Sequence, residues 1–383
     1  MAMWCSFRRS LRSHAAPVIG LALLLGCSPP ERPGGAIAPL PIAPIAPAAA
    51  PTMPRPGPPE PGYDPIAVNA ACIDCHRAIG EENAASFHGQ AHVDPIYQTA
   101  LAIEPLPFCR ACHAPEADPR QPVSAALGAL GVTCTSCHWS QGRVLAGLAS
   151  AGRAADPHRG LVAAPVVRIE DFAGPSACAG CHEFHFPDGR ARARPELMQS
   201  TISEHRQSPF AEVGCGSCHM PTVNEAAGGH RSHAFASSRD PRTLRATLDV
   251  KAERTPAGVR LQITPAAIGH AMPTGDLFRR LRIEVEQIGP DMNVVAVKRR
   301  FLARHFESRP TIMSLRRTVV RDDRPGGADV GHETQVIEFA FPDLAPGHFF
   351  GWRIELERVF HPAPGGDEKA VVAHRQVIRE GKL

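Results

Sequence analysis

The stretch Cys134-Thr-Ser-Cys137-His138 decides how this chain folds, because the 383 residues contain five copies of the pattern Cys-x-x-Cys-His. Numbered first to fifth in chain order, the copies are Cys72-Ile-Asp-Cys75-His76, Cys109-Arg-Ala-Cys112-His113, Cys134-Thr-Ser-Cys137-His138, Cys178-Ala-Gly-Cys181-His182 and Cys215-Gly-Ser-Cys218-His219. The same cysteines and histidines in random order would give about 0.02 copies. The pattern is therefore not an accident of composition.

The spacing of each motif indicates covalent haem attachment. Two thiols one turn apart can form thioethers with the two vinyl groups of a haem, while the next residue's imidazole reaches the iron from one face. Structural zinc would pair Cys-x-x-Cys units two by two, and thioredoxin-like chemistry needs a single unit. We therefore expect five haem c groups, with the first and second cysteine of every motif as thioether sites and His76, His113, His138, His182 and His219 as proximal iron ligands.

The first 26 residues indicate export. A basic start is followed by a short apolar stretch and then by Leu24-Leu25-Gly26-Cys27, which resembles a bacterial lipoprotein signal. The apolar stretch is short for a membrane span, which argues against an uncleaved anchor. We expect Cys27 to be the lipidated first residue of the mature chain. By resemblance to lipoproteins, Ser28 favours delivery to the outer membrane, facing the periplasm or the cell surface.

Residues 27–65 hold the lipidated cysteine and a tether rich in Pro and Ala, a composition that cannot form helix or sheet ladders. In a polyproline II conformation the tether would span up to about 120 Å. The formal net charge of +3 equals the contribution of Arg8, Arg9 and Arg12 in the signal, so the mature chain is close to neutral. No basic stripe with interleaved aromatic residues supports binding to nucleic acid.

Two regions of different character follow the tether. Residues 66–236 carry all five motifs in turn-rich sequence, so we expect a pentahaem domain of short helices in which the haems supply much of the core. One helix is expected from Pro195 to His205, where proline precedes a helix-forming run. Residues 237–383 lack cysteine and show apolar residues at every second position, for example Val259, Leu261 and Ile263. This period predicts an antiparallel β-sandwich, and the fold class is α+β.

Histidines outside the motifs could supply the sixth, distal iron ligand. The candidates are His88, His92, His158, His185, His205, His230, His233 and His270. His88 and His92 are one helical turn apart and could serve different irons, and the pair His230 and His233 closes the haem region. Because candidates outnumber the five irons, every iron could be bound on both faces, although any single histidine could equally be an ordinary surface residue.

The chain resembles the multihaem cytochrome c family related to the tetrahaem electron carrier of ammonia oxidisers, in a bacterial form with an added C-terminal β domain. The resemblance is carried by Ser86-x-His88, Gly131 to His138, Ser176 to Pro187, Met198 to Thr201, Cys215 to Pro221 and Gly269-His270-Ala-Met-Pro273-Thr-Gly275. It implies haems with two histidine ligands, and it makes His88, His158, His233 and His270 the best distal candidates, with His92 next. The family usually carries tryptophan where this chain has His205.

Three functions are compatible with these patterns. We expect an electron carrier that connects a membrane-linked, quinol-dependent donor with a periplasmic or cell-surface redox protein, because irons bound on both faces cannot bind substrate. A multihaem oxidoreductase acting on a small nitrogen or sulfur compound would need one five-coordinate haem. A structural or docking subunit of a larger cytochrome complex would use its haems mainly as core.

Overall fold

A computed structural model describes residues 64–148, 166–170, 172, 174–185, 197–223, 229–235, 239–310, 315–342, 346–360 and 367–383. These residues all belong to one compact unit, Ala49–Leu383. The signal peptide, Cys27, nearly all of the tether and His158 lie outside the described residues, so the predictions made for them stay predictions. Within the described residues, no helix is both long and apolar enough to span a bilayer.

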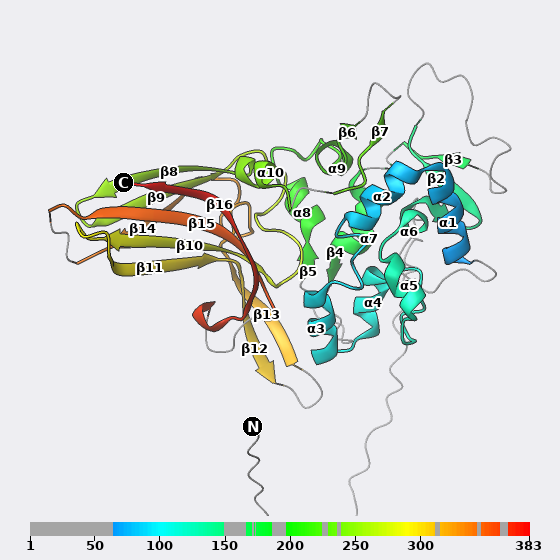
Figure 1. Ribbon diagram of the computed structural model, residues 1–383, viewed down its shortest axis with the longest axis horizontal. Helices are drawn as coiled ribbons and strands as arrows, with labels where there is room; N and C mark the ends of the chain where they lie inside the picture. The colour runs from blue at the N-terminus through cyan, green and yellow to red at the C-terminus, as the bar shows by residue number, and fades with distance from the viewer. Residues whose placement is uncertain are drawn as a thin grey trace, which may run out of the picture. The chain divides into compact units, whose positions relative to one another are not determined.

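Short helices dominate the region that carries the motifs (Figure 1). They are α1 (Pro65–Cys75), α2 (Arg77–Ala85), α3 (Pro95–Ile103), α4 (Pro107–His113), α5 (Ala125–Leu130), α6 (Cys134–His138), α7 (Pro175–His182), α8 (Thr201–Arg206) and α9 (Cys215–His219). Both α1 and α3 begin with proline after an aspartate whose side chain accepts two backbone N–H bonds, Asp64 for α1 and Asp94 for α3. These caps satisfy donors that the first helical turn leaves free.

Small strands connect these helices. They are β1 (Trp139–Ser140), β2 (Arg143–Ala146), β3 (Val166–Arg168), β4 (Glu183–His185), β5 (Leu197–Ser200), β6 (Thr222–Val223) and β7 (His230–Arg231). Three pairs are antiparallel, β1 with β2, β4 with β5, and β6 with β7, whereas β2 and β3 run parallel.

The helix expected from Pro195 to His205 is wrong in its first half. Residues Leu197–Ser200 form β5, which pairs with β4, and the helix α8 starts only at Thr201. The carboxylate of Glu183 accepts the backbone N–H groups of Ile202 and Ser203, both at 3.1 Å. Strand pairing and this cap therefore overrode the local helix propensity.

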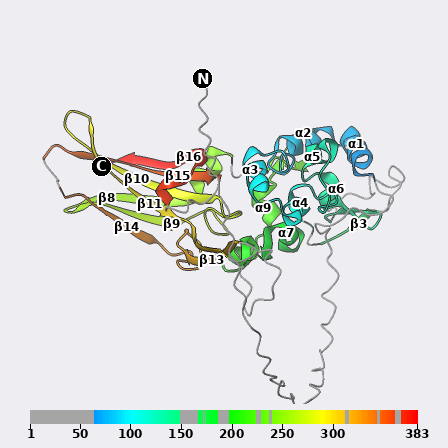
Figure 2. The same ribbon diagram turned by 90° about the horizontal axis from the view of Figure 1, so that it is seen from below.

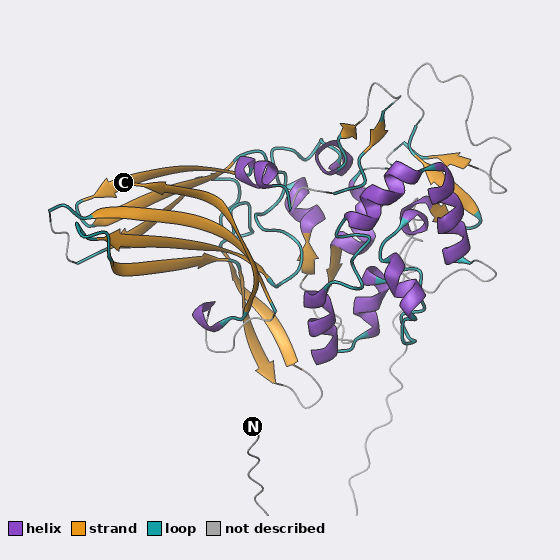
Figure 3. Cartoon of the chain, in the orientation of Figure 1, coloured by secondary structure: helices purple, strands orange, loops and turns teal. Residues whose placement is uncertain are grey.

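Long strands dominate the sequence from α10 (Pro241–Ala246) onward (Figure 3). They are β8 (Leu248–Thr255), β9 (Gly258–Pro265), β10 (Arg279–Ile288), β11 (Val294–Leu302), β12 (Arg304–Pro310), β13 (Leu315–Asp322), β14 (Gln335–Ala340), β15 (Phe349–Val359) and β16 (Val372–Lys382), with a 3-10 turn at Asp367–Lys369. One antiparallel sheet has the order β11-β10-β15-β16 and another β14-β9-β8, while β12 and β13 form a separate hairpin. The views show the strands of the two larger sheets running side by side (Figure 2), while β12 and β13 point away from them in Figure 1.

Apolar side chains from both sheets meet in one buried cluster. Val259, Leu261 and Ile263 of β9 are buried together with Leu281 and Ile283 of β10. The alternation predicted from the sequence is therefore confirmed for β9, whereas in β10 the polar residues Arg282 and Glu284 between the apolar ones are buried too. The mixture of helices and antiparallel sheets confirms the α+β class. The boundary predicted near residue 236 stays a prediction.

Candidate haem-binding centres

Each of the five motifs lies in the last turn of a short helix or forms the whole of one. The motif cysteines belong to α1, α4, α6, α7 and α9. Cysteines at positions i and i+3 of a helix share one face, and the histidine follows at the helix end. All ten motif cysteines are free thiols. The backbone therefore presents two thiols and an imidazole together, as thioether attachment and iron ligation require.

The third motif faces a histidine from outside the motifs. The imidazoles of His138 and His233 have ring centroids 6.3 Å apart. A metal–imidazole nitrogen bond is about 2.0 Å long, so two rings that bind one ion from opposite sides have centroids about 6.2 Å apart. The Nδ1 atoms point to backbone carbonyls, His138 to Leu145 at 2.8 Å and His233 to Arg231 at 2.7 Å. Because a carbonyl only accepts, Nδ1 carries the proton and Nε2 keeps its lone pair for a metal.

The fourth motif shows a similar separation. The centroids of His182 and His88 are 6.2 Å apart. Burial is the main cause that lowers the pKa of His182 to about 3 and that of His88 to about 4. Both rings are therefore neutral near pH 7 and able to bind a metal. The Nδ1 of His182 lies 2.8 Å from the side-chain amide of Gln199.

The fifth motif completes a third pair. The rings of His219 and His270 are 6.0 Å apart and nearly parallel, at 19°. Burial lowers the pKa of His219 to about 4 and also lowers the pKa of His270. The Nδ1 of His270 contacts the Ala271 carbonyl at 3.0 Å. His88, His233 and His270, which the family resemblance put forward, thus each face a motif histidine.

A tyrosine, not an imidazole, lies against the histidine of the second motif within the described residues. Tyr97 stacks on His113 with centroids 3.8 Å apart, and His92 lies 5.6 Å from Tyr97. The Nδ1 of His113 points to the Ala91 carbonyl at 2.8 Å, as that of His138 in the third motif points to a backbone carbonyl. The Tyr97 hydroxyl and the Nδ1 of His92 are buried without a hydrogen-bond partner. His92 therefore lies beside the second motif but does not face its imidazole directly.

The remaining candidate histidines have other surroundings. The Nε2 of His205 lies 3.0 Å from the Val213 carbonyl, just before the fifth motif. His230 contacts the Glu82 carboxylate at 3.0 Å, and His185 is exposed on β4. His158, another distal candidate, lies outside the described residues.

The motifs lie close together in an order that differs from their order in the chain. Buried Asn69 of α1 donates to Thr135 of α6 at 2.7 Å, which joins the first motif to the third. The ring of Phe235 lies 4.3 Å from His88 and 6.2 Å from His233, between the third and fourth pairs. After burial, the charges of His88 and then His219 lower the pKa of His182, so the fifth motif neighbours the fourth.

The second motif contacts the fourth motif through a pair of cysteine side chains. The thiols of Cys112 and Cys181 are hydrogen-bonded, and this contact is the largest cause that lowers the pKa of Cys112. Within the described residues, no three His, Cys, Asp or Glu side chains converge as ligands of a single ion. Pairs of facing imidazoles suit a metal whose other ligands come from a porphyrin, because such an iron takes only two ligands from the protein. The residues present therefore fit haem.

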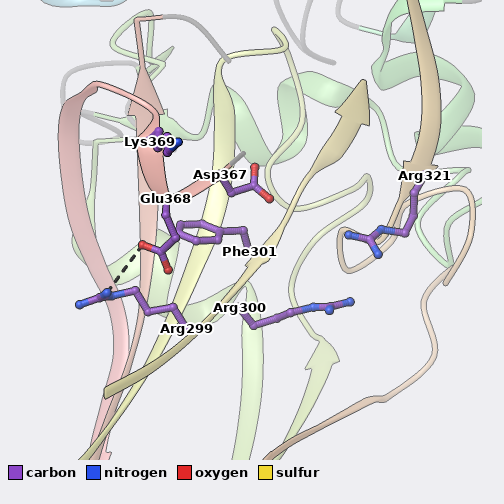
Figure 4. A pocket seen from close by; sticks show the side chains of 7 residues that line it. All are labelled: Arg299, Arg300, Phe301, Arg321, Asp367, Glu368 and Lys369. Carbon is purple, nitrogen blue, oxygen red and sulfur yellow. Dashed lines mark ion pairs between the residues drawn. The ribbon is translucent and has the colours of Figure 1, made fainter. Parts of the chain in front are cut away.

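A pocket of about 330 Å³ in the strand-rich region carries different chemistry (Figure 4). Four cationic side chains, two carboxylates and Phe301 line it. Its arginines are already ion-paired: Arg299 with Glu368 at 3.6 Å, and Arg300 and Arg321 with Asp323 at 3.4 and 3.2 Å. No cysteine or histidine lines the pocket, so it is separate from the candidate haem centres.

Neither a protein-family model nor a curated protein matches the chain. Among solved structures, the chain is similar to the crystal structure of a penta-heme cytochrome c552 from Thermochromatium tepidum. The TM-score is 0.62 at 18% sequence identity, and the match covers 84% of this chain and 100% of the other. At this identity the likeness is one of fold.

The sequence reasoning missed several residues that hold the ligands. Glu82 accepts the backbone N–H of His233 at 2.8 Å, Gln199 contacts His182, and Phe235 separates two of the pairs. Gln199 lies in the Met198–Thr201 stretch that carried the family resemblance, which was the one available signal. For Glu82 and Phe235, the sequence offered no signal, because their partners are distant in the chain.

Proposed function

We propose that this protein is a multihaem c-type cytochrome that carries electrons through five covalently bound haems. The single observation that carries the proposal is the set of three imidazole pairs, each joining one motif histidine to a histidine from elsewhere at 6.0 to 6.3 Å. The fold likeness to a penta-heme cytochrome supports it. When bound, haem c supplies an iron that accepts and releases single electrons.

The chain's own residues would hold and shield these groups. The ten motif cysteines would form the thioethers, and His76, His113, His138, His182 and His219 would bind the irons from one face. His88, His233 and His270 would bind three of them from the other face. Two neutral imidazoles per iron leave no open position, so these three centres suit electron transfer rather than bond chemistry.

The neighbouring motifs would give electrons a continuous route. The contacts described above run from the first motif through Asn69 to the third, through Phe235 to the fourth, and on to the fifth. The second motif lies beside the fourth, where the sulfur atoms of Cys112 and Cys181 are neighbours. A quinol-linked donor and a periplasmic or cell-surface acceptor would meet the ends of this route. Cys27 would carry the lipid that anchors the protein, with the outer membrane as the expected site.

One observation favours a second function, a multihaem oxidoreductase acting on a small nitrogen or sulfur compound. Within the described residues, no imidazole faces His113 at the 6.0 to 6.3 Å of the three pairs, so no histidine is assigned to the opposite face of an iron bound there. Tyr97 stacks flat on His113 with centroids 3.8 Å apart and would lie on the His113 side of that iron. This function would require an open iron position at the second motif.

Electron paramagnetic resonance of the oxidised holoprotein separates the two functions. After mass spectrometry has established five haems on the chain, a carrier should give only low-spin ferric signals. A high-spin signal from one haem, shifted by added nitrite or hydroxylamine, would favour the oxidoreductase. A chain expressed with the haem-attachment machinery that carried no haem would overturn both functions.

A further inference from the structure

We propose that Gln199 and Glu204 are positioning residues for the ligands of two neighbouring irons, Gln199 for His182 and Glu204 for His270. The inference rests on the proposed function. Two separate branches of hydrogen bonds carry it: the contact of Gln199 with His182, and the linked side chains of Thr201, Thr274, Glu204 and Arg324, which we call the Glu204 network. This network starts at α8 and ends in the strand-rich region, at the segment that follows β13.

The first branch reaches His182 through a side chain. Gln199 of β5 is 7% exposed, and its amide lies 2.8 Å from the Nδ1 of His182. A half-turn of the amide exchanges its oxygen and nitrogen, which places an acceptor against the Nδ1–H of an imidazole that binds metal through Nε2. His113, His138, His233 and His270 instead have backbone carbonyls at Nδ1, which no side-chain substitution removes. Gln199 is therefore a hydrogen-bond partner of a ligand Nδ1 that a side-chain substitution can change.

The Glu204 network begins at Thr201, the first residue of α8. The Thr201 hydroxyl lies 2.8 Å from the Thr274 hydroxyl, and Thr274 donates to Glu204 at 2.6 Å. Because Thr274 donates to the carboxylate, Thr201 donates to Thr274 and has no proton left for the oxygen of Gln199, so the two branches are separate. Since Thr201 lies in α8 and Thr274 follows His270, the network joins α8 to the loop of His270.

The second branch fixes the loop of His270. Glu204 accepts the backbone N–H of Ala271 at 3.2 Å, and the carbonyl of Ala271 contacts the Nδ1 of His270 at 3.0 Å. Ser200 also donates to Glu204, at 2.8 Å. The carboxylate is 8% exposed, so its contacts are made in a largely water-free setting. A shift of Glu204 would move the residue that orients the ligand ring.

Arg324 locks this arrangement from the strand-rich region. Its guanidinium, 3% exposed, donates to Glu204 and to the carbonyl of Pro273, both at 2.7 Å, and pairs with Asp322 at 2.7 Å. Glu204 and Arg324 both contact the His270 loop, at Ala271 and Pro273, so their opposite charges offset each other there. A buried negative charge stabilises the ferric form of a nearby iron more than the ferrous form. Removing the charge of Glu204 should therefore raise the potential of that haem as well as loosen its ligand.

The test uses full-length holoprotein and measures haem midpoint potentials together with the g-values of each low-spin signal. Glu204→Gln should raise the potential of one haem and alter one set of g-values. Gln199→Glu should lower the potential of a different haem, because a carboxylate at Nδ1 increases the basicity of the ligand, and Gln199→Leu should alter that haem's g-values.

Matched controls separate positioning from stability. Glu357, 0% exposed and paired with Arg280 at 2.8 Å, is an equally buried carboxylate of β15, and Gln287, 1% exposed, is an equally buried amide of β10. Glu357→Gln and Gln287→Leu should lower the melting temperature without changing any potential or g-value. Wild-type potentials and g-values in the Glu204 and Gln199 variants would overturn the proposal.

If Glu204→Gln does not accumulate with its haems, Thr274→Val takes its place, because it removes one hydrogen bond to the Glu204 carboxylate. The potential and g-values of the same haem should change. The proposed function is tested beforehand on the wild-type protein, by its haem count and its low-spin spectrum. A wild-type chain without haem therefore refutes the function, whereas unchanged variants refute only the positioning roles of Gln199 and Glu204.

Discussion

His219 and His270 face each other with ring centroids 6.0 Å apart and an angle of 19° between their planes. The first ends the fifth motif, and the second lies in a loop that Arg324 and Glu204 hold in place. One candidate iron site is thus built from both the helical and the strand-rich parts of the chain. A haem bound by both histidines would therefore link the two parts.

Replacing His270 by alanine should open one iron. Because His270 is the imidazole that faces His219, we expect the variant to keep five covalent haems while one of them changes from low-spin to high-spin. Electron paramagnetic resonance and haem counting check this outcome. His374→Ala, at an exposed position of β16, is the matched control and should keep the wild-type spectrum. A His270→Ala protein with unchanged low-spin signals would show that another residue binds this iron.

The low-spin spectrum should resist acid. The folded-state pKa values of His88 and His219 are depressed from 6.5 to about 4, mainly by burial. Below pH 6.5 the unfolded chain therefore binds protons that the folded chain does not, and stability falls as the pH drops from about 6.5 toward 4. These values hold for imidazoles without iron, and an iron at Nε2 competes with the proton, so we expect no change in spin state from pH 8 down to about 4 and conversion to high spin only below it. An absorbance titration with its midpoint near 6.5 would contradict this.

Asn69 should be a strong stability determinant of the contact between the first and third motifs. It is 1% exposed, donates to Pro65 and Thr135, and accepts from Thr133 and Thr135. Asn69→Leu leaves buried partners unsatisfied and should cost about 3 kcal/mol of unfolding free energy. Chemical denaturation measures the change. Asn293→Leu, in an exposed turn, should cost less than about 0.5 kcal/mol, and equal costs for the two variants would rule out a special role for Asn69.

Asp94 combines a helix cap with an ion pair, and the two contributions can be separated. It caps α3 and lies 3.2 Å from Arg358 of β15, whereas Asp64 caps α1 in the same way at an exposed position. Asp64→Ala should cost about 1 kcal/mol for the lost cap. Asp94→Ala should cost about 1 kcal/mol more, because a half-buried ion pair is lost as well. The excess should vanish in an Arg358→Met background, and an excess that persists there would assign it to another contact of Asp94.

The wrong prediction of a helix at Leu197–Ser200 has a definite physical cause. Residues 195–205 have good helix formers behind a proline, yet Leu197–Ser200 are a strand. The reason is the pairing with β4 and the contact of Gln199 with His182. Both partners precede the segment in the chain by more residues than one helical turn spans. Local propensity cannot register such partners.

The sequence by itself determined the chemistry that depends on neighbours in the chain. The Cys-x-x-Cys-His spacing specifies how thiols and an imidazole share one helical turn, and the two-residue period of Val259, Leu261 and Ile263 specifies which face of β9 is buried. Only the tertiary structure decided which histidine faces which motif, and which of Gln199, Glu204 and Arg324 hold them. Those contacts join segments far apart in the chain, and a distance through space leaves no fixed spacing in the sequence.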